Sequence, residues 1–229
     1  PPGAGTPLTV VVANIYHRNP TPAEVWPALL APDPDILVTI ETTARALTAA
    51  GAGLDALPHR LMPATGEARR VAIFSRHPVA RGRLHLDNTR APTAAEAVIV
   101  LPGGRGLGLV GVHLSRPGEG LQFRQARALG PIAARLGPHR LVLGDFNAAP
   151  WTHTVALAAA ASGTRIVPGY RRTWRGTYPI PGLPLPAPLG HAIDHALLSP
   201  GIGLARIDTL AVPGSDHRAL LLKLRLPRP

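Results

Sequence analysis

Polar residues that directly follow apolar runs are the part of this sequence best suited to chemistry. They comprise four carboxylates, two carboxamides and two histidines, namely Glu41, Asp145, Asp194, Asp216, Asn14, Asn147, His113 and His217. Carboxylates brought together repel one another and raise one another's pKa, so a cluster of them needs a counter-charge. A bound divalent cation supplies that charge, and oxygen ligands without cysteine favour Mg²⁺ or Mn²⁺ over zinc.

The same residue types suit the hydrolysis of a phosphate ester. Asparagine and protonated histidine can donate hydrogen bonds to phosphoryl oxygens, and an acid can orient or deprotonate the attacking water. Each residue by itself has a structural explanation: Asn14 could form a turn, Glu41 could lie at a helix N-terminus, and His113 could be a core histidine. Their joint occurrence favours one common site.

The segment Leu141–Asn147 shows how an element could position such residues. Three apolar residues lead into Gly144, and a carboxylate and a carboxamide follow one residue apart. Alternation along an extended chain places Asp145 and Asn147 on one side and Phe146 on the other. The segment alone would also fit a strand followed by a Gly-Asp turn, but the similar strand ends elsewhere favour an active site on a rigid strand.

Short apolar runs predict the strands that carry these residues. We expect strands at 8–15, 35–40, 71–74, 79–86, 95–101, 108–114, 141–147, 192–198, 202–212 and 219–226. Helices are expected from Thr21 to about Leu30, after Glu41 to about Ala50, and at 119–136 and 151–161. The first two strands each precede a helix, and 79–86 and 95–101 form an antiparallel pair. The pattern favours an α/β (α+β) fold in a single domain over residues 1–229.

The composition sets further limits. At 229 residues with 45% hydrophobic residues, the chain can bury the core of one compact domain, and disorder is excluded. There is no cysteine, so disulfides and thiolate metal sites are excluded, and no apolar run is long enough to span a bilayer. The net charge of +11, from 24 basic and 13 acidic residues, favours a phosphate-bearing partner such as nucleic acid, anionic lipid or a phosphorylated metabolite.

A change of composition marks the segment 162–190. It is rich in proline and glycine, and it interleaves Arg171, Arg172 and other arginines with Tyr170 and Trp174. We expect a long loop that packs over the body and faces the substrate. Arg171 and Arg172 would contact phosphates, and Trp174 would stack against bases if the substrate is nucleic acid.

Several motifs follow one another in a recognisable order. They are Asn14 after a strand, Pro34-Asp-Ile-Leu-Val-Thr-Ile-Glu41, Val71-Ala-Ile-Phe-Ser75, Val112-His-Leu114, Gly144-Asp-Phe-Asn147, Ile193-Asp-His195 and Gly214-Ser-Asp-His217. In these motifs and their order, nearly the whole chain resembles the endonuclease/exonuclease/phosphatase superfamily, which includes deoxyribonuclease I, abasic-site endonucleases and neutral sphingomyelinases. The Gly-Asp-Phe-Asn and Ser-Asp-His motifs are the most specific. The family usually has glutamine before the glutamate, where this chain has Ile40.

The resemblance implies a deoxyribonuclease I-like fold, a four-layer αββα sandwich of two packed mixed β-sheets flanked by helices. It also implies that Glu41 is the principal ligand of a Mg²⁺ or Mn²⁺ ion, with Asn14 and Asp216 near the metal. Two further expectations are that Glu67 orients His113 and that Arg70 binds phosphate.

The resemblance assigns the catalytic roles as well. Asp145 and Asn147 would orient the attacking water and hold the phosphate. His113, and His217 paired with Asp194, would act as base or stabilise the charged transition state. Which histidine takes the proton is left open.

A closer likeness is to the bacterial branch of the superfamily that includes the VanJ and YafD-like proteins. It rests on the compact length, on Trp151 after Asn147-Ala-Ala-Pro150, and on the proline-rich run into Pro188-Leu-Gly190. Members typically carry membrane segments before the catalytic domain. We therefore expect a lost upstream anchor, membrane association and an extracytoplasmic location, with a cytoplasmic location left open. We also expect a monomer.

Together these observations predict a metal-dependent phosphoesterase that hydrolyses phosphodiester or phosphomonoester bonds by in-line attack of water. Three variants of this hypothesis stay open: an endonuclease acting on DNA, a phosphatase acting on a lipid-linked, polyprenyl-type phosphate, and a catalytically silent module that binds an anionic polymer. The basic charge supports the first, and the closer likeness supports the second. Acids at the centre of a basic surface argue against the third.

Overall fold

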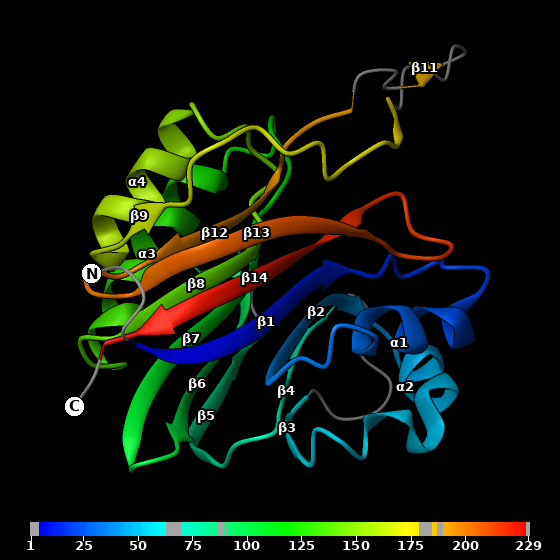
Figure 1. The fold of residues 1–229 in the computed structure, drawn as a ribbon. Coiled ribbons are helices and arrows are strands. Elements are labelled where there is room, and N and C mark those ends of the chain that lie inside the picture. The colour runs from blue at the N-terminus through cyan, green and yellow to red at the C-terminus, as the bar shows by residue number, and fades with distance from the viewer. Residues whose placement is uncertain are drawn as a thin grey trace.

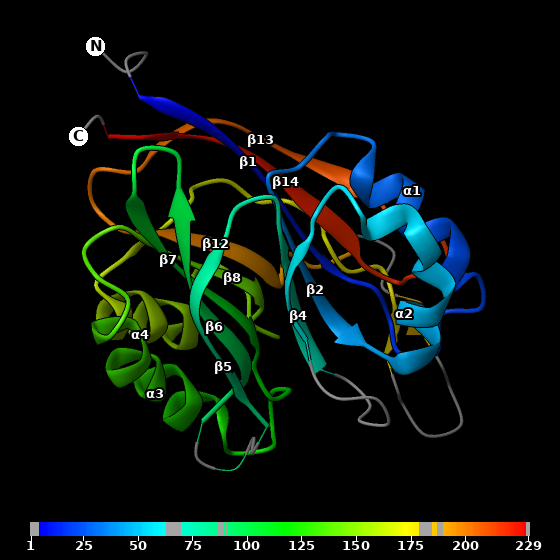
Figure 2. The ribbon, with the colours of Figure 1, turned by 90° about the horizontal axis from the view of Figure 1, so that it is seen from below.

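Two six-stranded β-sheets pack face to face in a computed structural model of the chain (Figure 1). The structure describes residues 5–62, 70–86, 89, 91–178, 185–186 and 190–227. Helices cover the outer face of each sheet, so the molecule has four layers (Figure 2). The predicted four-layer αββα sandwich is therefore confirmed.

The first sheet, which we call sheet A, joins the two ends of the chain. Its strand order is β13-β14-β1-β2-β4-β3. The strands are β1 Thr6–Asn14, β2 Ile36–Thr42, β3 His59–Leu61, β4 Arg70–Ser75, β13 Gly203–Ala211 and β14 Arg218–Leu226. Strand β1 is parallel to β2 and antiparallel to β14, so the first and last strands are neighbours inside the sheet.

The second sheet, sheet B, is formed by the middle of the chain. Its strand order is β5-β6-β7-β8-β12-β9. The strands are β5 Val79–His85, β6 Thr93–Leu101, β7 Arg105–His113, β8 Arg140–Asp145, β9 Arg165–Ile166 and β12 Asp194–Leu198. The predicted antiparallel pairing of β5 with β6 is confirmed, and β7 and β8 form the parallel pair of this sheet.

The helices bury one face each against the sheets. On sheet A lie α1 (Pro22–Leu30) and α2 (Ala44–Ala50), followed by a 3₁₀ turn, η1 (Gly51–Leu54). On sheet B lie α3 (Gln122–Ala134) and α4 (His153–Ser162). No helix among the described residues is long and apolar enough to cross a membrane.

Three layers of apolar side chains hold the sandwich together. The central layer lies between the sheets and includes Val10, Val38, Leu109 and Leu143. Trp26 belongs to the layer beneath α1 and α2, and Phe146 belongs to the layer beneath α3 and α4. Because both faces of each sheet are covered, the inner strands are apolar on both sides, which explains their continuous apolar runs in the sequence.

Two glycines permit close approaches of the backbone. A Cβ at Gly111 of β7 would lie 2.7 Å from the side chains of Val38 and Val71 on the facing sheet. A Cβ at Gly144 of β8 would lie 2.1 Å from the carbonyl oxygen of Val112, and the φ angle of Gly144 is 144°. A side chain at Gly144 would thus push β8 away from β7 just before Asp145.

The segment 162–190 contains more regular structure than expected. Strand β9 extends the edge of sheet B by pairing with β12. Two short strands, β10 (Thr177–Tyr178) and β11 (Leu185–Pro186), pair with each other. Residues 167–176 form the loop that was predicted, whereas 179–184 and 187–189 lie outside the described residues.

The substitution Gly144→Ala tests the close approach at β8. We expect a loss of about 2–4 kcal/mol in the free energy of unfolding, because the new Cβ meets a backbone oxygen and the φ angle is unfavourable. Thermal denaturation followed by circular dichroism would show a lower Tm, by roughly 5–15 °C. The control is Gly53→Ala, whose Cβ would meet only Leu30 Cδ1 at 3.9 Å. Equal Tm values for the two variants would contradict the prediction.

Candidate active site

Two pairs of parallel strands end at the same edge of the sandwich. Asn14 ends β1, His113 ends β7 and Asp145 ends β8, while Glu41 is the penultimate residue of β2. Asn14 and Glu41 belong to sheet A, and His113 and Asp145 belong to sheet B. The side-chain Nδ2 of Asn14 donates a hydrogen bond to Oδ2 of Asp145 at 3.1 Å. This bond joins the two sets of strand ends across the two sheets.

The carboxylate of Asp145 is the centre of the cluster. Its Oδ1 accepts the backbone N–H of Asn147 at 2.8 Å. Its Oδ2 lies 3.7 Å from Nε2 of His113 and 3.8 Å from Nε2 of His217. Burial and the nearby charge of Asp194 raise the pKa of Asp145, against the opposing effects of the two histidines. Asp145 can therefore hold a proton more readily than an ordinary aspartate.

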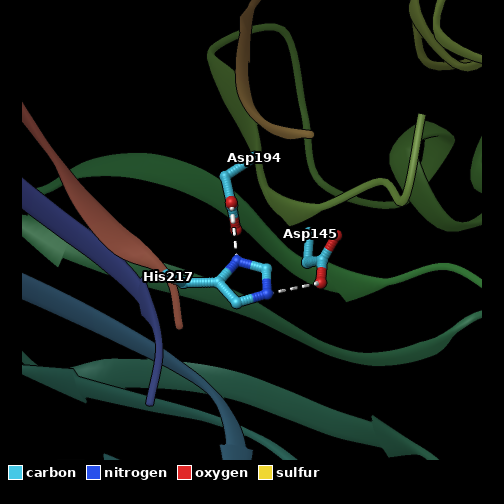
Figure 3. A group of neighbouring side chains, drawn as sticks. All are labelled: Asp145, Asp194 and His217. Carbon is cyan, nitrogen blue, oxygen red and sulfur yellow. Dashed lines mark hydrogen bonds and ion pairs between the residues drawn. The ribbon is translucent and has the colours of Figure 1, made fainter. Parts of the chain in front are cut away.

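Asp194 and His217 form a buried pair beside Asp145 (Figure 3). Asp194 opens β12, directly opposite Asp145 on β8, and its Oδ2 lies 2.8 Å from Nδ1 of His217. Since a carboxylate only accepts, Nδ1 carries the hydrogen, and Nε2 faces Asp145. Burial lowers the pKa of His217, but the charge and hydrogen bond of Asp194, with the charges of Asp145 and Asp216, raise it to about 10. His217 is thus an imidazolium at neutral pH.

Glu41 lies in an unusual backbone conformation. Its φ angle is 57°, and the pairing of β2 with β4 is irregular between Thr39 and Thr42. One carboxylate oxygen, Oε2, contacts His17, and the other, Oε1, lies 3.9 Å from Nε2 of His113. Burial alone would raise the pKa of Glu41, but the backbone N–H of His17, the charge of His113 and the imidazole of His17 together lower it.

His17 was not identified from the sequence. Its backbone N–H donates to Oε2 of Glu41 at 2.9 Å, and its Nδ1 lies 2.5 Å from the same oxygen. The available signal was its position three residues after Asn14, in the loop that follows a strand with a site residue at its end. That loop turns at Tyr16, whose φ angle is 60°.

Asn147 does not continue the extended alternation that we expected. Strand β8 ends at Asp145, and Asn147 has a φ angle of 47°. Its Nδ2 donates to the carbonyl of Leu114 at 2.9 Å, and Phe146 is fully buried. A left-handed turn, rather than a continuing strand, holds Asn147 beside Asp145.

Asp216 and Trp174 are in direct contact. Nε1 of Trp174 donates to Oδ2 of Asp216 at 2.8 Å, and the indole stacks on His191 with ring centroids 5.7 Å apart. Trp174 lies in the loop 167–176, and its predicted contact with substrate stays a prediction. However, its ring is half-buried against the wall of the site, so little of it is presented for stacking with a base.

The three predicted arginines occupy different surroundings. Arg70 opens β4 opposite Thr42, next to Glu41, and its Nη1 donates to the carbonyl of Leu86 at 3.0 Å. Arg171 donates to the carbonyl of Pro168 at 2.8 Å within its own loop, and Arg172 is exposed. The structure thus places Arg70 beside a site strand. Their predicted contacts with substrate remain predictions, and Glu67 lies outside the described residues.

Two buried polar side chains that were not predicted fix the loops of the site. Asn19 donates to the carbonyls of Ile15 at 3.0 Å and Pro213 at 2.8 Å, which ties the loop after β1 to the loop before β14. Thr173 accepts the backbone N–H of Asp194 at 3.1 Å. These bonds hold Asp194 and the Ser215-Asp-His217 turn in register with the strand ends.

The donor set fits a hard divalent cation. Oε1 of Glu41 faces the cluster, and the buried Oδ1 of Asp216 accepts no hydrogen bond from any described residue. Oxygen donors of this kind suit Mg²⁺ or Mn²⁺. Asp145, Asp194 and His217 also offer ligand atoms within 4.8 Å of one another. Both ring nitrogens of His217 face these carboxylates, however, which favours a hydrogen-bonded array over a second metal centre.

Comparisons with known proteins give the following matches. The sequence model of the Endonuclease/Exonuclease/phosphatase family matches residues 11–217. No significant match was found among curated proteins. The structure of D. rerio TDP2 complexed with a single-strand DNA product is similar, with a TM-score of 0.77 and 14% identity over 96% of this chain and 99% of that chain.

Two bacterial structures are similar to the same extent. Sphingomyelinase C from Streptomyces griseocarneus has a TM-score of 0.68 and 16% identity over 95% of this chain and 99% of that chain. Beta toxin from Staphylococcus aureus with bound magnesium ions has a TM-score of 0.69 and 13% identity over 95% of this chain and 99% of that chain. At these identities the likenesses establish the fold alone.

The substitution Asp194→Asn tests the charge of His217. The pKa of about 10 in the folded protein exceeds the ordinary value of 6.5. Protonation of His217 therefore stabilises the fold, fully below about pH 6.5, and this contribution is lost as the pH rises through about 10. Removing the carboxylate of Asp194 removes most of this contribution. We expect the Tm of the wild type to exceed that of the variant by several degrees at pH 6.5, and the difference to shrink toward pH 10.

Thermal denaturation in EDTA at a series of pH values measures this effect. The control is Asp208→Asn, which removes an exposed ion pair with Arg206. Its Tm should follow that of the wild type at every pH. A constant difference in Tm between the wild type and Asp194→Asn would show that His217 does not titrate as expected.

Proposed function

Because the chain belongs to the endonuclease/exonuclease/phosphatase family, we propose that it is a divalent-metal-dependent phosphoesterase. It hydrolyses a phosphodiester or phosphomonoester bond by in-line attack of water. The observation that carries this proposal is the buried array Asp194–His217–Asp145 where the two sheets meet, with His113 close to both Asp145 and Glu41. The array combines a proton donor, a carboxylate of raised pKa and hard oxygen ligands within one edge of the fold.

The surroundings of each site residue determine the role that we assign to it. Glu41, Asn14 and Asp216 would hold the cation, which when bound would supply charge stabilisation to the phosphoryl group. Asp145 orients the attacking water, and its raised pKa makes it a better proton acceptor at neutral pH. Asn147 helps to hold the phosphate.

The two histidines stabilise negative charge. Asp194 fixes the tautomer of His217, whose Nε2–H can donate to a phosphoryl or leaving-group oxygen. Nε2 of His113 lies 3.9 Å from Glu41 and 3.7 Å from Asp145, which is beyond hydrogen-bond distance of either, so it can donate to a substrate oxygen instead. In this proposal His217 donates a proton and His113 contacts the phosphoryl group.

Two substrate classes share the required phosphate chemistry. The net charge of +11 supports nucleic acid, as does an exposed aromatic pair in which Trp151 stacks on Tyr170 with centroids 5.6 Å apart. The likeness to the VanJ and YafD-like branch supports a lipid-linked phosphate, membrane association and an extracytoplasmic location. We propose a monomer in either case.

The substitution Asp145→Ala tests the function. With Mg²⁺ or Mn²⁺, we expect the wild type to hydrolyse bis-p-nitrophenyl phosphate, and the variant to lose about 10²–10⁴-fold in kcat/KM because the water is no longer oriented. EDTA should abolish the wild-type activity. Plasmid DNA and a polyprenyl diphosphate, assayed in parallel by gel and by phosphate release, distinguish the two substrate classes.

The control for this experiment is Asp55→Ala, which removes an exposed carboxylate that pairs with Arg60. It should retain wild-type activity. Full activity of Asp145→Ala would remove Asp145 from the site. Binding of anionic polymer by the wild type without turnover of any substrate would instead favour the silent module.

The substitution Trp151→Ala tests the exposed aromatic pair as a substrate contact. Trp151 is 74% exposed, and its free face can stack against a base before any chemistry takes place. We expect KM for single-stranded DNA to rise about tenfold with kcat unchanged, because the contact is the same in the ground and transition states. Trp151→Phe, which keeps a ring, should restore most of the affinity. An unchanged KM in Trp151→Ala would exclude the pair from binding DNA.

A further inference from the structure

His17 and Glu41 form a contact that no part of the proposed reaction yet explains. The backbone N–H and the imidazole of His17 both reach Oε2 of Glu41, at 2.9 and 2.5 Å. Both side chains are largely buried, with 14% of His17 and 8% of Glu41 exposed. A carboxylate oxygen only accepts, so Nδ1 of His17 carries the hydrogen in this bond.

The two carboxylate oxygens of Glu41 have different surroundings. Oε2 is occupied by two donors from one residue, whereas Oε1 points toward His113 and the strand ends. We propose that His17 is a positioning residue of the metal site, which holds Oε2 so that Glu41 presents Oε1 alone to a divalent cation. The inference rests on the metal dependence of the proposed function.

Glu41 needs such support because its backbone does not fix its side chain. At a φ angle of 57° and beside a break in the register of β2 and β4, Glu41 departs from the regular pleat that directs side chains in a strand. A long side chain on such a residue has several rotamers of similar energy, and ordering it costs free energy at every binding event. Two hydrogen bonds from His17 hold the side chain of Glu41 in one conformation before the metal binds.

His17 is itself held in place. The ring packs edge-on against Tyr16, with centroids 5.3 Å apart and an interplanar angle of 73°. The loop that carries it is anchored by Asn19, which donates to the carbonyls of Ile15 and Pro213. The imidazole is therefore a fixed donor.

The role of His17 differs from direct ligation. Nδ1 is engaged by Glu41, so a direct metal bond would have to come from Nε2. Partners that orient a metal ligand in this way typically change metal affinity by about 10–100-fold. A direct imidazole ligand would instead favour metals that accept nitrogen donors over Mg²⁺.

Three substitutions of His17 distinguish the role of Nδ1 from that of Nε2. His17→Ala removes both, and His17→Asn places an amide N–H close to the position of Nδ1. His17→Gln places its amide nearer to the position of Nε2. The backbone N–H of residue 17 remains in all three. The matched control is His77→Ala, since His77 has a similarly buried ring, 18% exposed, and lies 3.9 Å from Asp35.

Isothermal titration calorimetry of the full chain with Mg²⁺ and with Mn²⁺ tests the inference. We expect Kd for Mg²⁺ to rise about 10–100-fold in His17→Ala and His17→Gln, and to stay within about threefold of wild type in His17→Asn and His77→Ala. In the bis-p-nitrophenyl phosphate assay, His17→Ala should regain most of the wild-type kcat at saturating Mg²⁺, with an unchanged KM for the substrate. Its Tm in EDTA should stay near that of the wild type.

The outcomes distinguish this inference from the proposed function. If the wild type binds Mg²⁺ and His17→Ala binds it equally well, the positioning role is wrong and the function stands. A much larger loss for Mn²⁺ than for Mg²⁺ would identify His17 as a direct ligand and also overturn it. If the wild type binds neither metal, the metal dependence of the proposed function fails, and the inference fails with it.

Discussion

Two buried carboxylates at one edge of the sandwich set the electrostatic requirement that the surrounding residues must meet. Asp145 and Asp194 face each other on neighbouring strands, and only 2% and 5% of their surfaces are exposed. Carboxylates in this position lose hydration and repel each other, so the fold must bring positive charge and hydrogen-bond donors to them. The imidazolium of His217 lies against both, and Asn14 reaches Asp145 from the facing sheet. The same contacts therefore join the two sheets and balance the charges of the site.

Backbone strain is concentrated around the same residues. Four non-glycine residues in the described part of the chain have a positive φ angle, and three of them, Tyr16, Glu41 and Asn147, belong to the site or to its loops. Conformations of this kind cost of order 1–3 kcal/mol each and persist only where surrounding contacts hold them. Here the contacts are hydrogen bonds from His17 to Glu41 and from Asn147 to Asp145 and Leu114. The free energy gained by burying the apolar strands offsets the cost of these strained turns.

Local patterns in the sequence predicted the strands and the polar residues at their ends, whereas the four layers were expected only from the resemblance to a known family. Apolar runs marked the buried strands, and polar residues after them marked the edge where Asn14, Glu41 and Asp145 meet. The contact of His17 with Glu41 could not be predicted, since it depends on a left-handed turn at Tyr16 and on an irregularity in β2, and neither has a local signature in residues other than glycine. The bond from Asn19 to Pro213 joins residues 194 positions apart, which periodicity does not reveal. Trp174 contacts Asp216, which fixes the direction of its indole, and its role as a substrate contact stays a prediction.

The order of strands in sheet A has a consequence for the assembly of the protein. Strand β1 lies between β2 and β14, so one of its two edges stays open until the last strand has been synthesised. Sheet B consists of strands from residues 79–198 and can pair all of them earlier. The same final segment delivers Asp216 and His217. Until residues 216–226 have been made, the chain therefore has neither a complete sheet A nor the full set of candidate site residues.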